Sequence, residues 1–260
     1  MPEGDTLHLL ANKLAPVVGS EVVAVVLPRS DQPTRGLPGR KLDAVFARGK
    51  NLVFSLGGPA ILVHLKMTGS VRLAPAPWRG PMAQLSLAIE VPGRVVVALR
   101  APTVKVFSAR GLAEQLARLG PDPIADDFDA DEAVRRLRAR SETALAIALT
   151  DQAAIAGIGN EWKSELLFDQ RLDPFARVAE FTDAELGALV RRASEVMRAT
   201  VASGRFERVM RRPGPPLAVY DRAGQPCLDC GGRVIMERQG RSGENPRSTY
   251  YCHHCQPRRS

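Results

Sequence analysis

Long apolar segments are absent from this 260-residue chain. No apolar run approaches the roughly 20 residues that a membrane-spanning helix requires. The opening MPEGDT has neither the basic nor the apolar part of a secretory signal. We therefore expect a cytoplasmic protein with no membrane partner.

Lysine is missing from the last quarter of the chain. Residues 201–260 contain 11 arginines, no lysine and five acidic residues, so this stretch carries +6 of the formal net charge of +8. A guanidinium group can hold phosphate through two hydrogen bonds, and no basic amphipathic helix with a strongly apolar face accompanies these arginines. The distribution favours a nucleic-acid partner over a membrane surface.

Short β-branched runs fill most of the first 108 residues. They are separated by Gly, Pro and Asn, as in antiparallel sandwiches or barrels, and the 45% hydrophobic content is enough for a packed core. A helix over residues 5–18, with Asp5 as its cap, precedes them. The expected strands span residues 21–27, 41–47, 51–56, 60–65, 70–74, 84–91, 94–99 and 104–108.

Helical spacing replaces this pattern near residue 109. Helices are expected over residues 111–120, 130–139, 141–152, 160–170 and 182–202. Residues 119–132 are rich in proline and acidic side chains, which predicts a solvated hinge. The sequence therefore predicts an α+β protein with a β-sandwich lobe (1–118), a helical lobe that starts with the acidic hinge (119–215) and a small C-terminal module (216–260).

The four cysteines of the chain form two CxxC pairs that are separated by 21 residues: Cys227 and Cys230, then Cys252 and Cys255. Two such pairs complete a tetrahedral Zn²⁺ site, which is closed and therefore structural. Disulfides are the alternative, and a chain without a secretory signal disfavours them. The two histidines inside the second pair are expected to be exposed, because four thiolates already satisfy the metal.

Two glycines interrupt the helical lobe in the stretch GIGN, residues 157–160. Glycine allows close approach of a ligand to the backbone, and a helix that begins here would point free N–H groups outward. Asn160 is placed to cap that helix or to bind a phosphate oxygen. A plain turn between two helices is the alternative.

Taken together, six motifs resemble the formamidopyrimidine-DNA glycosylase/endonuclease VIII family of base-excision repair enzymes. They are PEG at the N-terminus, RGKNL, HLKMTGS, LGPDPI, DQAAIAGIGN and RSTYYCHHCQ. The motifs occur in the family's order over essentially the whole chain. The resemblance implies a β-sandwich followed by a helix–two-turns–helix lobe with a zinc-finger hairpin, damaged DNA between the lobes, and extrusion of the damaged nucleotide from the stack.

The resemblance also implies a role for the first two residues after Met1. The amine of Pro2 is expected to attack C1′ of the damaged nucleotide, and an α-amine, which titrates near roughly 8, is partly unprotonated at neutral pH. Glu3 corresponds to the family's acid/base carboxylate. The expected activity is that of a DNA glycosylase and AP lyase.

Other positions of the motifs imply contacts with DNA. Lys50, Asn160 and Arg247 correspond to three phosphate-binding residues of the family, and Lys50 is also expected to belong to the catalytic residues with Pro2 and Glu3. Met67 corresponds to the side chain that fills the space left by the extruded base, although methionine is more often a core residue. Glu165 corresponds to a carboxylate near the N-terminal amine, with a position on the helix surface as the alternative, and the histidine of HLKMTGS is either half-buried or part of the DNA-facing loop.

Several departures from the family pattern bear on the substrate. Thr6, after Asp5, stands where the family often has Glu, and Asp5 is the candidate to take the place of that carboxylate. APTVKVF replaces the purine branch's DPRRFG, and the stretch before the first cysteine is short for that branch's base-capping loop. With PEG at the N-terminus, these features favour the endonuclease VIII branch and oxidised pyrimidines, while oxidised purines are the alternative.

Two other classes of protein explain part of the sequence. A non-catalytic zinc-ribbon DNA-binding protein accounts for the charge and the cysteines, but gives no reason for Pro2 and Glu3 to occur with Lys50. A metal-dependent nuclease requires clustered carboxylates or histidines, and the acids here are concentrated in residues 119–132. We expect a monomer that acts on damaged DNA in duplex, single-stranded or bubble form.

Overall fold

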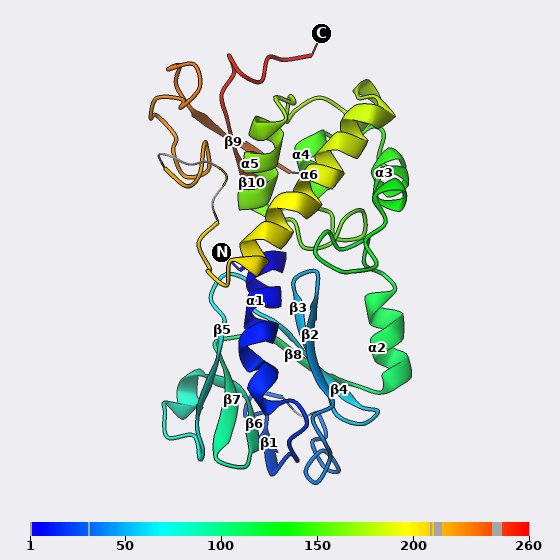
Figure 1. Ribbon diagram of the computed structural model, residues 1–260, viewed down its shortest axis with the longest axis vertical. Coiled ribbons are helices and arrows are strands. Elements are labelled where there is room, and N and C mark those ends of the chain that lie inside the picture. Colours follow the sequence, from blue (N-terminus) through cyan, green and yellow to red (C-terminus); the bar gives the residue numbers. More distant parts are fainter. Residues whose placement is uncertain (1, 31, 209, 211–214, 241–245, 260) are drawn as a thin grey trace. The chain divides into compact units, whose positions relative to one another are not determined.

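The computed structural model describes residues 2–30, 32–208, 210, 215–240 and 246–259. The chain divides into two compact units, Met1–Arg118 (unit 1) and Leu119–Ser260 (unit 2), and Figure 1 labels the helices and strands of each. None of the described helices is both long and apolar enough to cross a membrane.

Unit 1 is built from two four-stranded antiparallel sheets. One has the strand order β1-β6-β7-β5 and the other β2-β3-β4-β8. The main core cluster includes residues from both sheets and from helix α1, Gly4–Leu14. The strands are β1 (Ala24–Val26), β2 (Ala44–Arg48), β3 (Asn51–Ser55), β4 (Ala60–His64), β5 (Ser70–Pro75), β6 (Leu85–Val91), β7 (Arg94–Leu99) and β8 (Thr103–Phe107), followed by helix α2 (Ala109–Leu116).

The β-sandwich predicted from the alternating runs is confirmed, but the first strand is shorter than expected. Val22 exchanges backbone hydrogen bonds with residues 39 and 40, whereas the N–H of Val23 donates to the carbonyl of Glu90 on β6. The chain thus changes its pairing partner between these two residues, and only Ala24–Val26 remains paired as β1. The run EVVAVVL is β-branched on both sides of this point, so the sequence gives no sign of the change in pairing partner.

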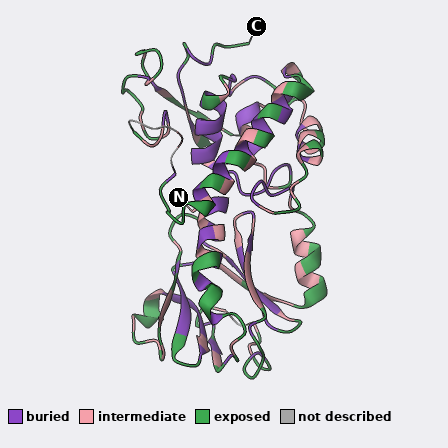
Figure 2. Ribbon diagram, in the orientation of Figure 1, coloured by how far each residue is buried: buried purple, intermediate pink, exposed green. Residues whose placement is uncertain are grey.

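Unit 2 is helical, with a two-stranded antiparallel hairpin near its end. Its core surrounds helix α5, which is buried over most of its length (Figure 2). The helices are α3 (Ala130–Arg138), α4 (Leu145–Thr150), α5 (Asn160–Asp169) and α6 (Asp183–Ala202), and the hairpin consists of β9 (Ile235–Gln239) and β10 (Arg247–Tyr251). One-turn 3₁₀ helices occur at Ala15–Val17, Met82–Gln84 and Val178–Glu180.

The helix expected over residues 141–152 is only half as long. It begins at Leu145, because Ala144 instead forms an isolated antiparallel bridge with Arg177. It ends at Thr150, and the next residue, Asp151, accepts a hydrogen bond from the N–H of Ala153 with its side chain (3.0 Å). Backbone pairing at one end and a polar side chain at the other therefore override the apolar periodicity.

The solvated hinge predicted for residues 119–132 is wrong for its first half. Residues 120–124 are buried, and the N–H of Ala156 donates to the carbonyl of Pro121 (2.9 Å). The Asp122 carboxylate accepts from the N–H of Ile124 (3.0 Å), and Ile124 joins the core of unit 2. These prolines and this acid therefore shape a packed segment, and solvation is confined to the later acids.

Candidate functional site

The N-terminal end of α1 positions the first candidate residues. Glu3 is the residue at the N-cap, in place of the predicted Asp5, and its side chain is fully buried, while Pro2 is half-buried. The Thr6 hydroxyl accepts the N–H of Glu3 (3.3 Å), which forms part of a capping box. A carboxylate is thereby fixed directly after Pro2, whereas Met1 lies outside the described residues.

Lys50 lies in the tight turn between β2 and β3. Gly49 before it has a positive φ of 56°, and the side chain of Asn51 closes the turn by donating to the carbonyl of Arg48 (3.2 Å). Asn51 pairs in register with His64 at the end of β4. Burial, and then the charge of Lys50, lower the pKa of His64, so the imidazole is held neutral beside this lysine.

Met67 belongs to a short loop between β4 and β5 that holds its side chain outward. Its exposed fraction is 69%, so the alternative of a core methionine is wrong. Lys66 has a positive φ of 48°, and its N–H donates to Nδ1 of His64 (3.1 Å). Gly69 closes the loop onto Leu65, where an added Cβ would lie 2.7 Å from the carbonyl oxygen. The loop therefore has a fixed backbone and an apolar tip.

In unit 2, the glycine turn before α5 rests on two supports. The side chain of Gln152 accepts from the N–H of Gly157 (3.0 Å) and donates to the carbonyl of Ile158 (3.0 Å). Gly120 packs closely against the backbone that precedes the glycine turn, so a Cβ on Gly120 would collide with Ala154. The motif LGPDPI thus supports the backbone of the glycine turn.

Asn160 begins α5 and Arg247 begins β10, and these two elements contact each other. Gly159 occupies the N-cap position and Asn160 is the first residue of α5, so the predicted capping role of Asn160 is wrong. Arg247 begins β10, is exposed and pairs in register with Gln239. A cavity of about 260 Å³ lies beside it, lined by Ala146, Ile147, Thr150, Asp151, Gln152, Lys163, Gln239, Gly240, Arg247 and Thr249. Residues 241–245, between β9 and β10 in the sequence, lie outside the described residues.

Glu165 is buried in the middle of α5, so the alternative of a helix-surface position is wrong. Its carboxylate accepts the N–H groups of Ala218 (2.7 Å), Val219 (2.8 Å) and Tyr220 (2.7 Å). Burial raises the pKa of Glu165, and these three hydrogen bonds oppose that rise. Within unit 2, Glu165 therefore anchors the segment that leads to the cysteine module.

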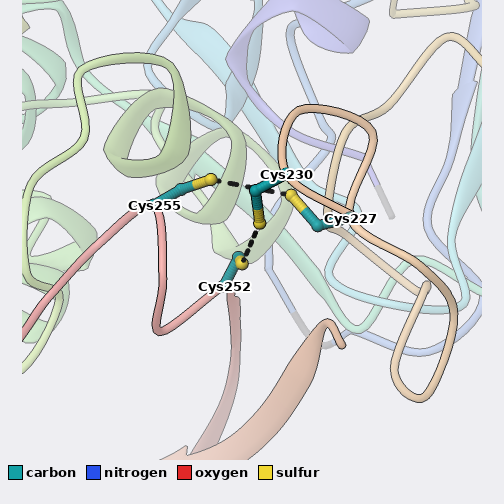
Figure 3. Close-up of side chains that lie close together, drawn as sticks. All are labelled: Cys227, Cys230, Cys252 and Cys255. Atoms are coloured by element: carbon teal, nitrogen blue, oxygen red, sulfur yellow. Dashed lines mark hydrogen bonds between the residues drawn. The ribbon is translucent and has the colours of Figure 1, made fainter. Parts of the chain in front are cut away.

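Four thiols converge in the cysteine module, as Figure 3 shows. The Sγ atoms of Cys227 and Cys255 are 3.7 Å apart and those of Cys230 and Cys252 3.5 Å, and all four lie within 4.8 Å of one another. Tetrahedral Zn²⁺ with bonds of about 2.3 Å places its sulfur ligands about 3.8 Å apart. The cluster therefore fits one Zn²⁺ held by these four residues, and the two histidines beside it are exposed as predicted.

Comparison with known proteins covers both units. Residues 1–102 match the family model of the formamidopyrimidine-DNA glycosylase N-terminal domain, and residues 119–209 match that of the H2TH domain. A probable endonuclease 8 2 of Streptomyces coelicolor is 35% identical to this chain. The alignment covers 98% of this chain and 94% of that protein. The chain belongs to the formamidopyrimidine-DNA glycosylase/endonuclease VIII family.

Both branches of this family occur among the similar proteins. A formamidopyrimidine-DNA glycosylase of Rhodospirillum rubrum is 33% identical over 97% of each chain. The fold is similar to that of the Lactococcus lactis formamidopyrimidine-DNA glycosylase in a crystal structure with DNA that contains an abasic site. That structure gives a TM-score of 0.84 and 21% identity over 98% of this chain and 100% of the other. The predicted two-lobed α+β fold is thereby confirmed.

Two polar residues that organise the family motifs in this chain were not predicted from the sequence. Gln152 holds the glycine turn, and the buried Lys163 contacts both α5 and β10. Gln152 stands within the motif DQAAIAGIGN, so the family resemblance could have identified it as a functional residue. A lysine in a helical segment gives no comparable signal, because lysine side chains are ordinarily exposed.

Proposed function

We propose that this protein is a DNA glycosylase and AP lyase that removes oxidised bases from damaged DNA. The observation that carries the proposal is the buried Glu3 carboxylate, fixed at the start of α1 directly after Pro2. An N-terminal secondary amine beside a carboxylate provides a nucleophile and a proton carrier without a cofactor. Membership of the family supports this assignment.

The proposed chemistry begins once Met1 is removed. The Pro2 nitrogen forms a bond to C1′ while the bond from C1′ to the damaged base breaks, and the proton lost from the amine neutralises the departing base. Glu3 supplies a proton to the ring oxygen as the sugar opens. The resulting iminium ion withdraws electrons and makes the C2′ proton acidic. Loss of that proton expels the 3′ phosphate, a second elimination expels the 5′ phosphate, and water releases the sugar fragment. A one-nucleotide gap remains.

We further propose that both units bind the same damaged strand. In unit 1, Lys50 offers a charged contact at a tight turn and Met67 an apolar tip. In unit 2, Asn160 at the start of α5 and Arg247 at the start of β10 offer two further phosphate contacts. Several such contacts help to offset the cost of unstacking the extruded nucleotide.

The cysteine module is proposed to bind one Zn²⁺ that has a structural role. The four thiolates would leave no position on the metal for water or substrate, so the ion supplies stability and no chemistry. In this role the ion would hold the chain that leads into β9 and the chain that follows β10. It would thereby position the strand that begins with Arg247. The active protein is proposed to be a monomer in the cytoplasm that associates with the nucleoid when it is bound to DNA.

The proposed substrates are oxidised pyrimidines in preference to oxidised purines. The replacement of DPRRFG by APTVKVF supports this choice. The stretch that was interpreted as a short base-capping loop includes residues 209 and 211–214, which lie outside the described residues. Oxidised purines remain the alternative substrate class.

The test compares excision of dihydrouracil and 8-oxoguanine in matched duplexes, with analysis of the product ends and with EDTA present. We expect faster removal of dihydrouracil and phosphates at both ends of the gap. Borohydride should trap a covalent complex, and Pro2→Gly should weaken it. Absence of any trapped complex would identify a non-catalytic DNA-binding protein, and faster removal of 8-oxoguanine would reverse the substrate assignment.

A further inference from the structure

Lys163 is a buried cation that the proposed chemistry does not use. It lies in the first half of α5, three residues after Asn160, and its exposed fraction is 2%. Its Nζ donates to Oδ1 of Asn160 (3.2 Å), to the carbonyl of Ser248 (2.8 Å) and to Oγ1 of Thr249 (2.9 Å). Lysine is almost never fully buried unless its hydrogen bonds are satisfied. Burial of this ammonium group therefore depends on these hydrogen bonds.

The contact with Asn160 determines which way that amide faces. An ammonium group only donates hydrogen bonds, so it selects the oxygen of the amide and not the nitrogen. The NH₂ group of Asn160 is consequently turned away from Lys163. A phosphate oxygen accepts hydrogen bonds, so an amide turned in this way presents donors to it, whereas the flipped amide would present its oxygen and repel the phosphate.

The other two contacts connect this amide to the hairpin. Ser248 and Thr249 follow Arg247 directly on β10, and α5 and β10 lie side by side (Figure 1). Ser164 adds a second link, because its hydroxyl donates to the carbonyl of Asn160 (2.9 Å) and accepts from a backbone N–H of β10 (3.3 Å). The start of α5 and the start of β10 are thus held in one arrangement.

We propose that Lys163 is a positioning residue that orients the Asn160 amide toward a DNA phosphate and holds the Arg247 strand in register with it. Lys163 itself does not contact DNA in this arrangement. The proposal rests on the proposed function of Asn160 and Arg247 as phosphate contacts. Its basis is the geometry of three hydrogen bonds from one buried nitrogen.

The experiment measures equilibrium binding to a duplex that contains a stable tetrahydrofuran analogue of an abasic site, and cleavage of a natural abasic duplex. The variants are Lys163→Met, which keeps the length but removes the donors, Lys163→Gln and Lys163→Arg, which keep a donor, Asn160→Ala, and the double variant Asn160→Ala/Lys163→Met. Arg192→Met is the matched control, because it removes a cation from ion pairs with Asp169 and Glu195 elsewhere in unit 2.

We expect Lys163→Met to weaken binding about tenfold to a hundredfold, as for loss of a hydrogen bond to a charged group. Lys163→Gln and Lys163→Arg should retain more binding, the control should match the wild type, and the double variant should be no weaker than the weaker of its two single variants. Fully additive losses would overturn the proposal, as would equal binding by Lys163→Met and the wild type. If Lys163→Met does not fold, Lys163→Gln takes its place: a shorter, neutral side chain cannot make all three hydrogen bonds, so binding equal to that of the wild type would overturn the proposal.

Binding and cleavage separate this proposal from the proposed function. If the wild type binds the analogue but does not cleave or form a trapped complex, the proposed function fails, and Lys163 is still tested by binding. If Asn160→Ala binds as tightly as the wild type, Asn160 is not a phosphate contact and the positioning role falls with it. A positioning role affects binding at unchanged zinc content, whereas a purely structural role would lower thermal stability and leave the binding of the folded fraction unchanged.

Discussion

The buried ion pair between Glu161 and Arg208 allows a sharp test of the packing in unit 2. Their charged atoms are 2.5 Å apart, and the two side chains are 12% and 5% exposed. The guanidinium also lies 5.7 Å from the ring of Trp162, which is fully buried. Replacement of Arg208 by Met should cost about 3–5 kcal/mol, because it leaves a carboxylate buried without this partner.

The expected change in melting temperature follows from the size of the unit. Unfolding entropy is roughly 2.1 cal/mol/K per residue, which gives about 0.3 kcal/mol/K for the residues from Leu119 to Ser260. The melting temperature of unit 2 should therefore fall by about 10–17 °C. Fluorescence of Trp162 in a Trp78→Phe background reports the transition, because these are the two tryptophans of the chain.

Two further variants separate the ion pair from other effects of the substitution. Arg192→Met removes a more exposed cation and should cost only about 0.2–1 kcal/mol. Combining Arg208→Met with Glu161→Leu should recover most of the loss, since the buried carboxylate is then removed as well. The reasoning is refuted if Arg208→Met costs no more than the Arg192 variant, or if the double variant is as unstable as the single one.

Three more outcomes are expected. A strong chelator, or Cys230→Ser, should lower both zinc content and the melting temperature of unit 2, and an unchanged melt of zinc-free protein would contradict a structural metal. Folding lowers the pKa of His64 from 6.5, so the contribution of His64 to stability is present above about pH 6.5 and is lost as the pH falls. The urea midpoints measured at about pH 7 and about pH 5 should therefore differ more for the wild type than for His64→Gln. Gly69→Ala should cost about 1–3 kcal/mol by pushing on the Leu65 backbone, whereas Gly111→Ala, which meets only side-chain atoms, should cost far less in urea unfolding.

The sequence predicts the architecture well where one physical pattern dominates. The eight strands of unit 1 and the helices of unit 2 follow from periodicity and from Gly and Pro punctuation, and most differ only at their ends. Errors arise where tertiary contacts compete with that pattern. Val22 and Val23 pair with different segments, and Ala144 pairs with Arg177 in place of a first helical turn.

Composition alone misassigned the start of unit 2. Prolines and acids are typical of exposed linkers, so residues 119–132 were expected to be solvated. Gly120 and Pro121 are instead buried against the backbone of residues 154–156, and Asp122 satisfies a local N–H group. Burial of such residues depends on distant segments, which composition does not describe.

Motif spacing identified candidate residues, but not the side chains that hold them. Cys227 and the three other cysteines were grouped correctly, because CxxC spacing itself specifies a metal-binding turn. The contact of Glu165 with Ala218 joins residues 53 positions apart, and that of Lys163 with Thr249 joins residues 86 positions apart. Only the folded chain brings such partners together, and the same applies to the outward position of Met67.

The packed LGPDPI segment limits where the polypeptide can bend between its two units. The carbonyl of Leu119 accepts from the side chain of Arg136 (2.9 Å), and the N–H of Ala117 still donates to Ala113 at the end of α2 (2.9 Å). Only the peptide groups around Arg118 lie between these two anchored positions. One or two glycines inserted at Arg118 would therefore fall between two anchored residues and leave the hydrogen bonds on both sides intact.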